Sequence, residues 1–98
     1  MGKTVYIVKR ERTIIMTEKQ KKRIQAFLES LEYVFRDSEV SHTTMHCEGD
    51  TVIFIRVSGY GNPMILTVKD KETTLRLPHT EYKDKSKDIT TAFVEAGL

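Results

Sequence analysis

Apolar residues between positions 17 and 35 recur with the period of an α-helix. One stripe at positions i, i+3, i+4 and i+7 is formed by Ile24, Phe27, Leu28 and Leu31. Thr17 precedes this stripe, and Gln20 stands three residues after Thr17, which is the residue pattern of a capping box at a helix start. The pattern therefore predicts an amphipathic helix that begins at Thr17 and ends between residues 32 and 35.

From residue 40 onward the period changes to two residues, which is typical of β-strands. Turn-forming residues divide this half of the chain into four segments at 40–48, 51–58, 64–69 and 73–77. Segment 51–58 is apolar on both sides, which predicts a central strand or a strand whose second face meets a partner. The four segments together predict an antiparallel meander.

The two ends of the chain predict shorter elements. Residues 4–8 predict a strand. Residues 13–16 either continue this strand or form a second strand that pairs with it in a hairpin. Residues 78–87 are polar and are expected to be exposed. A short closing helix before Gly97 is predicted by the helical spacing of Ile89, Ala92, Phe93 and Ala96.

These patterns predict an α+β fold with an N-terminal strand (or hairpin), a helix, a four-stranded antiparallel meander and a short C-terminal helix. We expect residues 1–98 to form a single α+β domain with both helices packed on one sheet face. The other face is expected to be solvent-exposed or an interface, and to carry His42, His46, Phe54 and Arg56.

The composition is that of a folded domain with a small core, since 39% of the 98 residues are hydrophobic and 31% are charged. Such a small core favours self-association into a homodimer. Cys47 is the one cysteine, so no disulfide can form within the chain, which fits a reducing compartment. No apolar run approaches the roughly 20 residues that span a bilayer. We therefore expect a cytoplasmic protein with no membrane partner.

Positive charge is concentrated in one stretch, although the net charge of the chain is only +2. Between residues 9 and 23, two acidic residues stand among seven basic ones, namely Lys9, Arg10, Arg12, Lys19, Lys21, Lys22 and Arg23. Cations in the first turns of a helix are repelled by the positive end of its dipole. Their presence indicates a binding site for an anionic partner. A solvated, lysine-rich helix face is the alternative interpretation.

Residues capable of metal or acid–base chemistry do not form an established motif. His42 and His46 share one strand face, but their Cα atoms would be about 13 Å apart, which is too far to hold one ion. Cys47 points to the other face and is expected to be a small core residue. The Gly59-Tyr60-Gly61 segment lacks the third glycine of a phosphate-binding loop. The sequence therefore predicts no catalytic residue, no metal site and no cofactor.

Segment 52–78 contains Arg56-Val57-Ser58-Gly59-Tyr60, followed by two strands and a basic, polar tail. It resembles the sheet core of the ribosome-dependent mRNA-cleaving toxins of toxin–antitoxin pairs. The resemblance implies a ribonuclease activity. It also implies that the phosphate is bound and protons are transferred by Arg56, Arg76, His79 and Tyr82.

The residues themselves favour a non-enzymatic binding module that acts as a regulator or inhibitor through protein–protein contact, of the kind that phages and mobile elements encode. Its expected partner is a macromolecule, protein or nucleic acid. Besides the basic residues, a second candidate interface on the sheet and its following loop consists of Phe54, Arg56 and Tyr60. Nucleic-acid binding through the basic 9–23 block is one alternative function, and a toxin-like ribonuclease is the other.

Overall fold

The computed structural model describes residues 16–70, 72–78 and 80–98. The elements in these ranges are α2 (Glu18–Val34), β2 (Val40–Cys47), β3 (Asp50–Val57), β4 (Met64–Val68), β5 (Thr73–Arg76) and α3 (Ser86–Glu95). A helix, a four-stranded antiparallel sheet and a short closing helix confirm the predicted small α+β fold. The predicted N-terminal strand or hairpin falls on residues that lie almost entirely outside the described ranges.

Helix α2 begins with the capping box that the sequence predicts. Thr17 Oγ1 accepts a hydrogen bond from the backbone N–H of Gln20 at 3.0 Å, and Gln20 Oε1 accepts one from the Thr17 N–H at 2.9 Å. These two bonds satisfy backbone donors that have no partner within the helix. The start of α2 is therefore fixed by local chemistry.

Helix α3 is followed by Ala96 and then by Gly97, whose φ of 84° lies in the left-handed region that glycine adopts without a steric penalty. The Gly97 N–H donates to the Val94 carbonyl at 3.0 Å, and the Leu98 N–H donates to the Phe93 carbonyl at 3.3 Å. This pair of bonds is a Schellman motif, which satisfies carbonyls of the last helical turn.

The sheet is an antiparallel meander in the order β2-β3-β4-β5, so β2 and β5 are its edges. Strand β2 joins β3 through Glu48 and Gly49, with φ values of 51° and 86°, and Cys47 pairs with Asp50. Two central residues with positive φ are the pattern of a type I′ turn, whose twist matches that of the flanking strands. This turn sets the register between β2 and β3.

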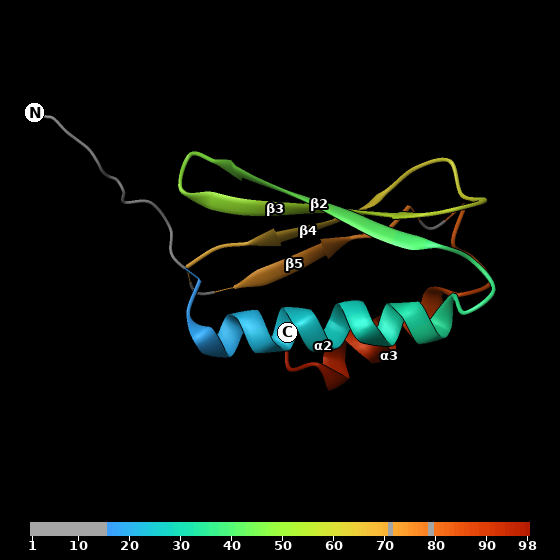
Figure 1. Cartoon of the computed structure of the whole chain (residues 1–98), viewed down its shortest axis with the longest axis horizontal. Helices are drawn as coiled ribbons and strands as arrows, with labels where there is room; N and C mark the ends of the chain where they lie inside the picture. The colour runs from blue at the N-terminus through green and yellow to red at the C-terminus, as the bar shows by residue number, and fades with distance from the viewer. Residues whose placement is uncertain (1–15, 71, 79) are drawn as a thin grey trace, which may run out of the picture.

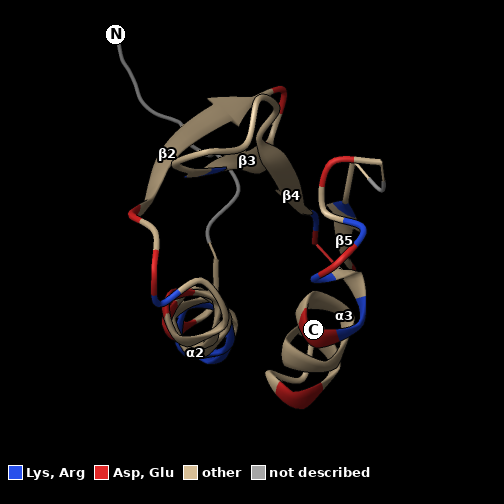
Figure 2. Cartoon of the chain, turned by 90° about the vertical axis from the view of Figure 1, so that its right-hand side faces the viewer, with Lys and Arg blue, Asp and Glu red and all other residues tan. Residues whose placement is uncertain are grey.

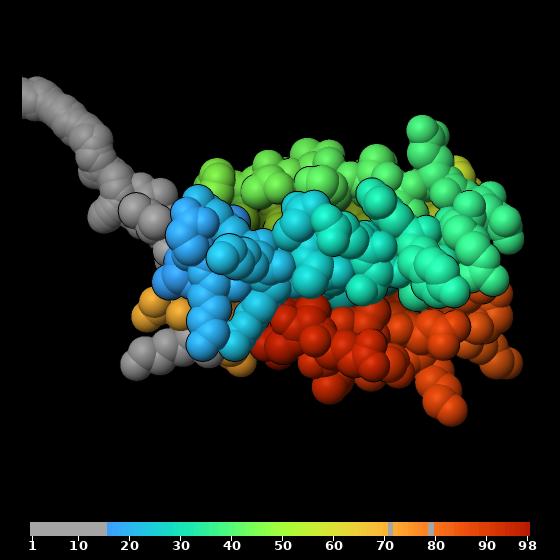
Figure 3. Space-filling view, turned by 60° about the horizontal axis from the view of Figure 1, so that its bottom comes forward, coloured from blue at the N-terminus to red at the C-terminus, as the bar shows by residue number. Residues whose placement is uncertain are grey.

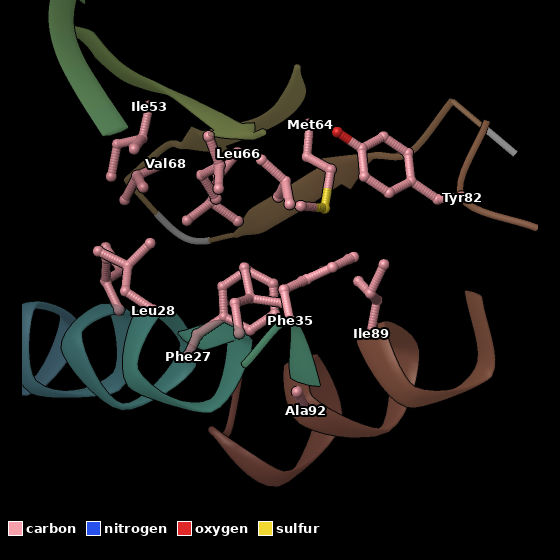
Figure 4. Close-up of a cluster of buried hydrophobic side chains, with 14 residues drawn as sticks. Phe27, Leu28, Phe35, Ile53, Met64, Leu66, Val68, Tyr82, Ile89 and Ala92 are labelled. Carbon is pink, nitrogen blue, oxygen red and sulfur yellow. The ribbon is translucent and has the colours of Figure 1, made fainter. Parts of the chain in front are cut away.

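The core lies between the sheet and the two helices, which are on the same side of the sheet (Figure 1). Side chains of β3 and β4 point toward those of α2 and α3 (Figure 4). The ring of Phe27 in α2 packs edge-to-face on the ring of Phe93 in α3, at a centroid distance of 5.6 Å. This contact joins the two helices. The fully buried apolar side chains include Leu31, Ile55, Met64, Leu66 and Ile89.

The expectation that residues 78–87 are exposed is wrong for Tyr82, whose side chain is fully buried. Its hydroxyl donates a hydrogen bond to the Asn62 carbonyl at 2.7 Å, and its ring packs edge-to-face on Phe35 at 6.0 Å. A tyrosine can be buried in this way because its hydroxyl keeps a partner. The polar segment thus supplies one of the largest core side chains.

The two faces of β2 also differ from the prediction. The register pairs His42 with Ile55 and His46 with Thr51, so both histidines are on the helix side of the sheet and not on the face of Phe54. His46 Nδ1 lies 3.2 Å from the hydroxyl of Thr51, which is fully buried. The histidines and Phe54 are therefore on opposite sides of the sheet.

Cys47 is exposed, which corrects the expectation that it is a core residue. It ends an edge strand in which every residue from Ser41 to Cys47 is exposed. The alternation of β2 therefore does not separate a buried face from an exposed one.

Candidate functional site

The side of the sheet that points away from the helices, here called the outer face, is not covered by any described element (Figure 2). Strand alternation and register place on it Ser41, Thr43, Met45 and Cys47 of β2, Asp50, Val52, Phe54 and Arg56 of β3, Ile65 and Thr67 of β4, and Thr74 and Arg76 of β5. The outer face is therefore a broad surface built from all four strands.

The centre of the outer face is apolar. In the register, Met45 lies opposite Val52, and Phe54 lies opposite Ile65. Val52, Phe54 and Ile65 are half-buried, because side chains on neighbouring strands shield one another. Met45, nearer the edge, is 52% exposed. An apolar patch of this kind, rimmed by polar residues, is typical of an interaction site.

Two arginines accompany the apolar centre. Arg76 lies opposite Ile65, and Arg56 follows Phe54 on the same face of β3. Both side chains are exposed, and neither is within ion-pair distance of a carboxylate in the described ranges. Asp50, the acidic residue of the outer face, lies at the other end of β3. One end of the outer face is therefore positively charged.

A hollow of about 490 Å³ lies beside this positive end. It is lined by Asn62, Pro63, Ile65, Arg76, Leu77 and Pro78. The lining combines apolar side chains with one guanidinium, whose planar N–H donors match the geometry of a carboxylate. The hollow can therefore receive an apolar or acidic side chain of a partner.

Asn62 and Pro63, which line this hollow, belong to a loop that is held in place by Glu81. The carboxylate of Glu81 accepts hydrogen bonds from the Gly61 N–H at 2.7 Å and from the side-chain amide of Asn62. A Cβ atom at position 61 would come within 2.8 Å of Glu81 Oε2, so a larger residue there would require the Glu81 carboxylate to shift. The lining of the hollow is thus organised before any partner binds, which lowers the entropic cost of binding.

Three aromatic rings support the same loop. The rings of Tyr60 and Tyr82 are stacked, and Phe35 packs edge-to-face on both of them. Burial raises the pKa of Tyr82, and the nearby Glu81 and Tyr60 raise it further. The Tyr82 hydroxyl, one of the groups that the toxin resemblance implies, is buried and donates its hydrogen bond to the Asn62 carbonyl. His79, implied by the same resemblance, lies outside the described residues.

The structure divides the interface predicted at Phe54, Arg56 and Tyr60. Phe54 and Arg56 are together on the outer face, whereas Tyr60 packs against the core beside Phe35. Sequence reasoning missed Ile65, which becomes a neighbour of Phe54 only when β3 and β4 pair. The alternation within residues 64–69 was the signal that could have placed Ile65 on this face.

The basic block is also divided. Lys19, Lys21 and Lys22 are exposed on α2, and Lys21 Nζ lies 3.8 Å from Glu18. Arg23 Nε would be only 3.1 Å from a Cβ atom at Gly97, so its side chain lies at the end of α3. A cation there interacts favourably with the helix dipole. This position of Arg23 differs from that of the three exposed lysines. The remaining basic residues of the block, Lys9, Arg10 and Arg12, fall outside the described ranges.

A groove of about 710 Å³ runs between α2 and α3, which lie side by side (Figure 3). Both signs of charge line it, from Glu29, Arg36, Lys85, Asp88 and Glu95. At its rim Tyr33 is 72% exposed, and the Arg36 guanidinium lies 5.2 Å from the centre of its ring. Because the groove mixes opposite charges, it selects no single kind of ligand, and the outer face is the stronger candidate site.

Within residues 16–70, 72–78 and 80–98, no three His, Cys, Asp or Glu side chains come together as a metal site. In the same ranges, no helix is long and apolar enough to cross a membrane. Comparisons with protein-family models, curated proteins and solved structures give no match to this chain, so its function is argued from the site itself.

Proposed function

We propose that this chain is a non-enzymatic binding module that regulates or inhibits a partner protein, and that the partner docks on the outer face. The observation that carries the proposal is the uncovered apolar centre formed by Val52, Phe54 and Ile65. Full burial of a large apolar side chain contributes about 1.5–3 kcal/mol, so a side chain that is still up to about a third exposed gains at most about 0.5–1 kcal/mol when a partner covers it. Met45 adds a more exposed side chain to the same patch.

The charges of the outer face indicate the chemistry of the partner. Arg56 and Arg76 flank the apolar centre, and Arg76 also lines the hollow beside it. A complementary surface has an apolar centre and carboxylates at one end, of which one enters the hollow. Arginine is well suited to such a contact because it can form two parallel hydrogen bonds with a carboxylate.

A protein partner fits the outer face better than a nucleic acid. Base stacking requires aromatic platforms along a basic track. Phe54 is the one aromatic residue among the outer-face residues, while Tyr60 and Tyr82 pack behind the loop. The exposed lysines of the basic block, Lys19, Lys21 and Lys22, are on α2, which lies on the opposite side of the sheet. The lysines of α2 are therefore separated from Phe54, which has only Arg56 and Arg76 as basic neighbours on the outer face.

Site-specific photo-cross-linking in the cells that produce the chain tests the proposal. The cross-linking residue replaces Thr67, on the outer face, or Thr91, which is exposed on α3. We expect a protein that is cross-linked from position 67 and not from position 91. That protein, purified, should form a stoichiometric complex with the chain.

Two variants with the same change of charge provide the control for that complex. Arg76→Glu, on the outer face, should weaken binding at least about tenfold, which corresponds to about 1.4 kcal/mol. Lys22→Glu, on α2, should leave the affinity unchanged. Nucleic acid cross-linked from position 67, or an equal loss of affinity in both variants, would contradict the proposal.

A further inference from the structure

Among the described residues, strand β2 leaves a long edge of the sheet open. It has eight residues, its hydrogen-bonded neighbour in the sheet is β3, and the side chains from Ser41 to Cys47 are exposed on both faces. The N–H and C=O groups that point away from β3 form a row that can pair with another strand. The described ranges place no element along this row.

The side chains of β2 do not protect this edge. Proteins usually block an open edge with charged residues, proline, a bulge or a very short strand. The sequence of β2, Val-Ser-His-Thr-Thr-Met-His-Cys, contains no Lys, Arg, Asp, Glu or Pro, and its register with β3 is unbroken over eight pairs. The opposite edge, β5, is protected in two of these ways, because it has only four residues and ends in the charged Arg76.

We infer that the edge of β2 is an interface at which a second copy of this chain pairs antiparallel, strand against strand. An antiparallel pair of identical strands has a two-fold axis perpendicular to the sheet. Residues that face each other across the axis must then be on the same sheet face. An axis at Thr43 or Thr44 keeps the strands overlapped over most of their length.

The residues that meet across this axis suit a second copy. With the axis at Thr44, this residue faces its own copy, His42 faces His46, and Thr43 faces Met45. Cross-strand threonine pairs and threonine–apolar pairs are favourable or neutral in sheets, whereas like charges placed opposite each other are destabilising. Because β2 contains no Lys, Arg, Asp or Glu, pairing with its own copy brings no two residues of these types together across the axis.

This pairing would join two four-stranded sheets into one continuous sheet. Because the axis is perpendicular to the sheet, both outer faces would be on the same side of the dimer, and the helices of both copies on the other. The inference does not depend on what binds the outer face, since it concerns the edge of the sheet.

A charge-exchange experiment on the full chain tests this interface. We expect sedimentation of the wild type to show a concentration-dependent species of twice the 11.3 kDa chain mass. Thr44→Lys and Thr44→Glu place like charges opposite or diagonal to each other across the axis, so each should weaken dimerisation at least about tenfold. An equimolar mixture of the two variants should recover the dimer, because Lys then faces Glu.

Controls separate the interface from effects on folding. Thr91→Lys, which adds the same charge on α3, should dimerise like the wild type. Hydrogen exchange of the wild type provides a readout without substitution: amides of β2 should become more protected as the concentration rises. A wild type that stays monomeric, Thr44 variants that still dimerise, or a mixture that does not recover the dimer would each overturn the inference.

Discussion

The ring of Tyr60 stacks on the ring of Tyr82 with centroids 4.5 Å apart and an interplanar angle of 3°. The two residues are 22 positions apart in sequence, so this contact links the loop after β3 to the segment before α3. The Tyr82 hydroxyl strengthens the link through its hydrogen bond to the Asn62 carbonyl. The contact therefore fixes the loop that contributes to the hollow beside Arg76.

Removal of the Tyr82 hydroxyl should destabilise the fold modestly. Tyr82→Phe keeps the stacked ring but leaves the Asn62 carbonyl without this donor, which should lower the free energy of unfolding by about 1 kcal/mol. Tyr82→Ala also removes the ring and should cost about 3–5 kcal/mol. Urea denaturation measures both values. Equal losses in the two variants would show that the ring contributes little.

The raised pKa of Tyr82 predicts a loss of stability at alkaline pH. Tyrosine in the unfolded chain titrates near the ordinary value of 10.0, whereas burial keeps the folded phenol protonated to higher pH. Above pH 10 the unfolded chain therefore binds fewer protons, and the free energy of unfolding falls as the pH rises. The contribution is constant below that pH. Tyr82→Phe should reduce the slope measured above pH 10, and an unchanged slope would contradict the assignment.

Gly61 and Glu81 should behave as a coupled pair. Gly61→Ala places a methyl group where Glu81 Oε2 now approaches, which should cost about 1 kcal/mol of stability. In a Glu81→Ala background the obstacle is absent, so the same substitution should cost measurably less. A double-mutant cycle by thermal or urea unfolding gives the coupling energy. Additive effects would show that the hydrogen bond does not restrict position 61.

Arg23 and Lys22 are adjacent in sequence but should differ in their effect on stability. Arg23→Gln removes a cation beside the last turn of α3 and should lower the free energy of unfolding by about 0.5–1 kcal/mol. Lys22→Gln, at an exposed site, should change it by less than about 0.5 kcal/mol. Chemical denaturation of the two variants checks this difference. A larger loss for Lys22→Gln would indicate that the lysine has a contact of its own.

The exposed lysines of α2 should contribute little to nucleic-acid binding. We expect short single- and double-stranded DNA and RNA to bind weakly, and substitution of Lys19, Lys21 and Lys22 by Gln to leave the salt dependence nearly unchanged. Fluorescence anisotropy at low and moderate salt measures both. Three phosphate contacts on duplex DNA would instead give a log–log salt slope of about −2.7. Such a slope, lost in the triple variant, would make nucleic acid the partner.

Elements that depend on local chemistry could be predicted from the sequence. The capping box at Thr17 and the apolar stripe of α2 were sufficient to place that helix, and alternation was sufficient to place the strands. The burial of Tyr82 could not be predicted in this way, because its partners, Phe35 and Asn62, are distant in sequence and no periodicity reports such a contact.

The site was predicted only in part for a related reason. Phe54 and Arg56 were correctly placed as neighbours on one strand, whereas Ile65 joins them only through strand pairing. The prediction that His42 lies on the same sheet face as Phe54 was wrong because of the turn between β2 and β3. Its two residues make each odd position of β3 face an even position of β2, so His42 pairs with Ile55.

The length of the same turn could change without a large loss of stability. A strand with one buried face resists a change of register, because a slip by one residue moves its apolar side chains into water. Strand β2 has no residue after Val40 that is buried on either face. Insertion of one residue beside Gly49 would therefore exchange the two faces of β2 and bring His42 and His46 to the side of Phe54, with little loss of core packing. Turn length alone could thus change the chemistry that this edge presents.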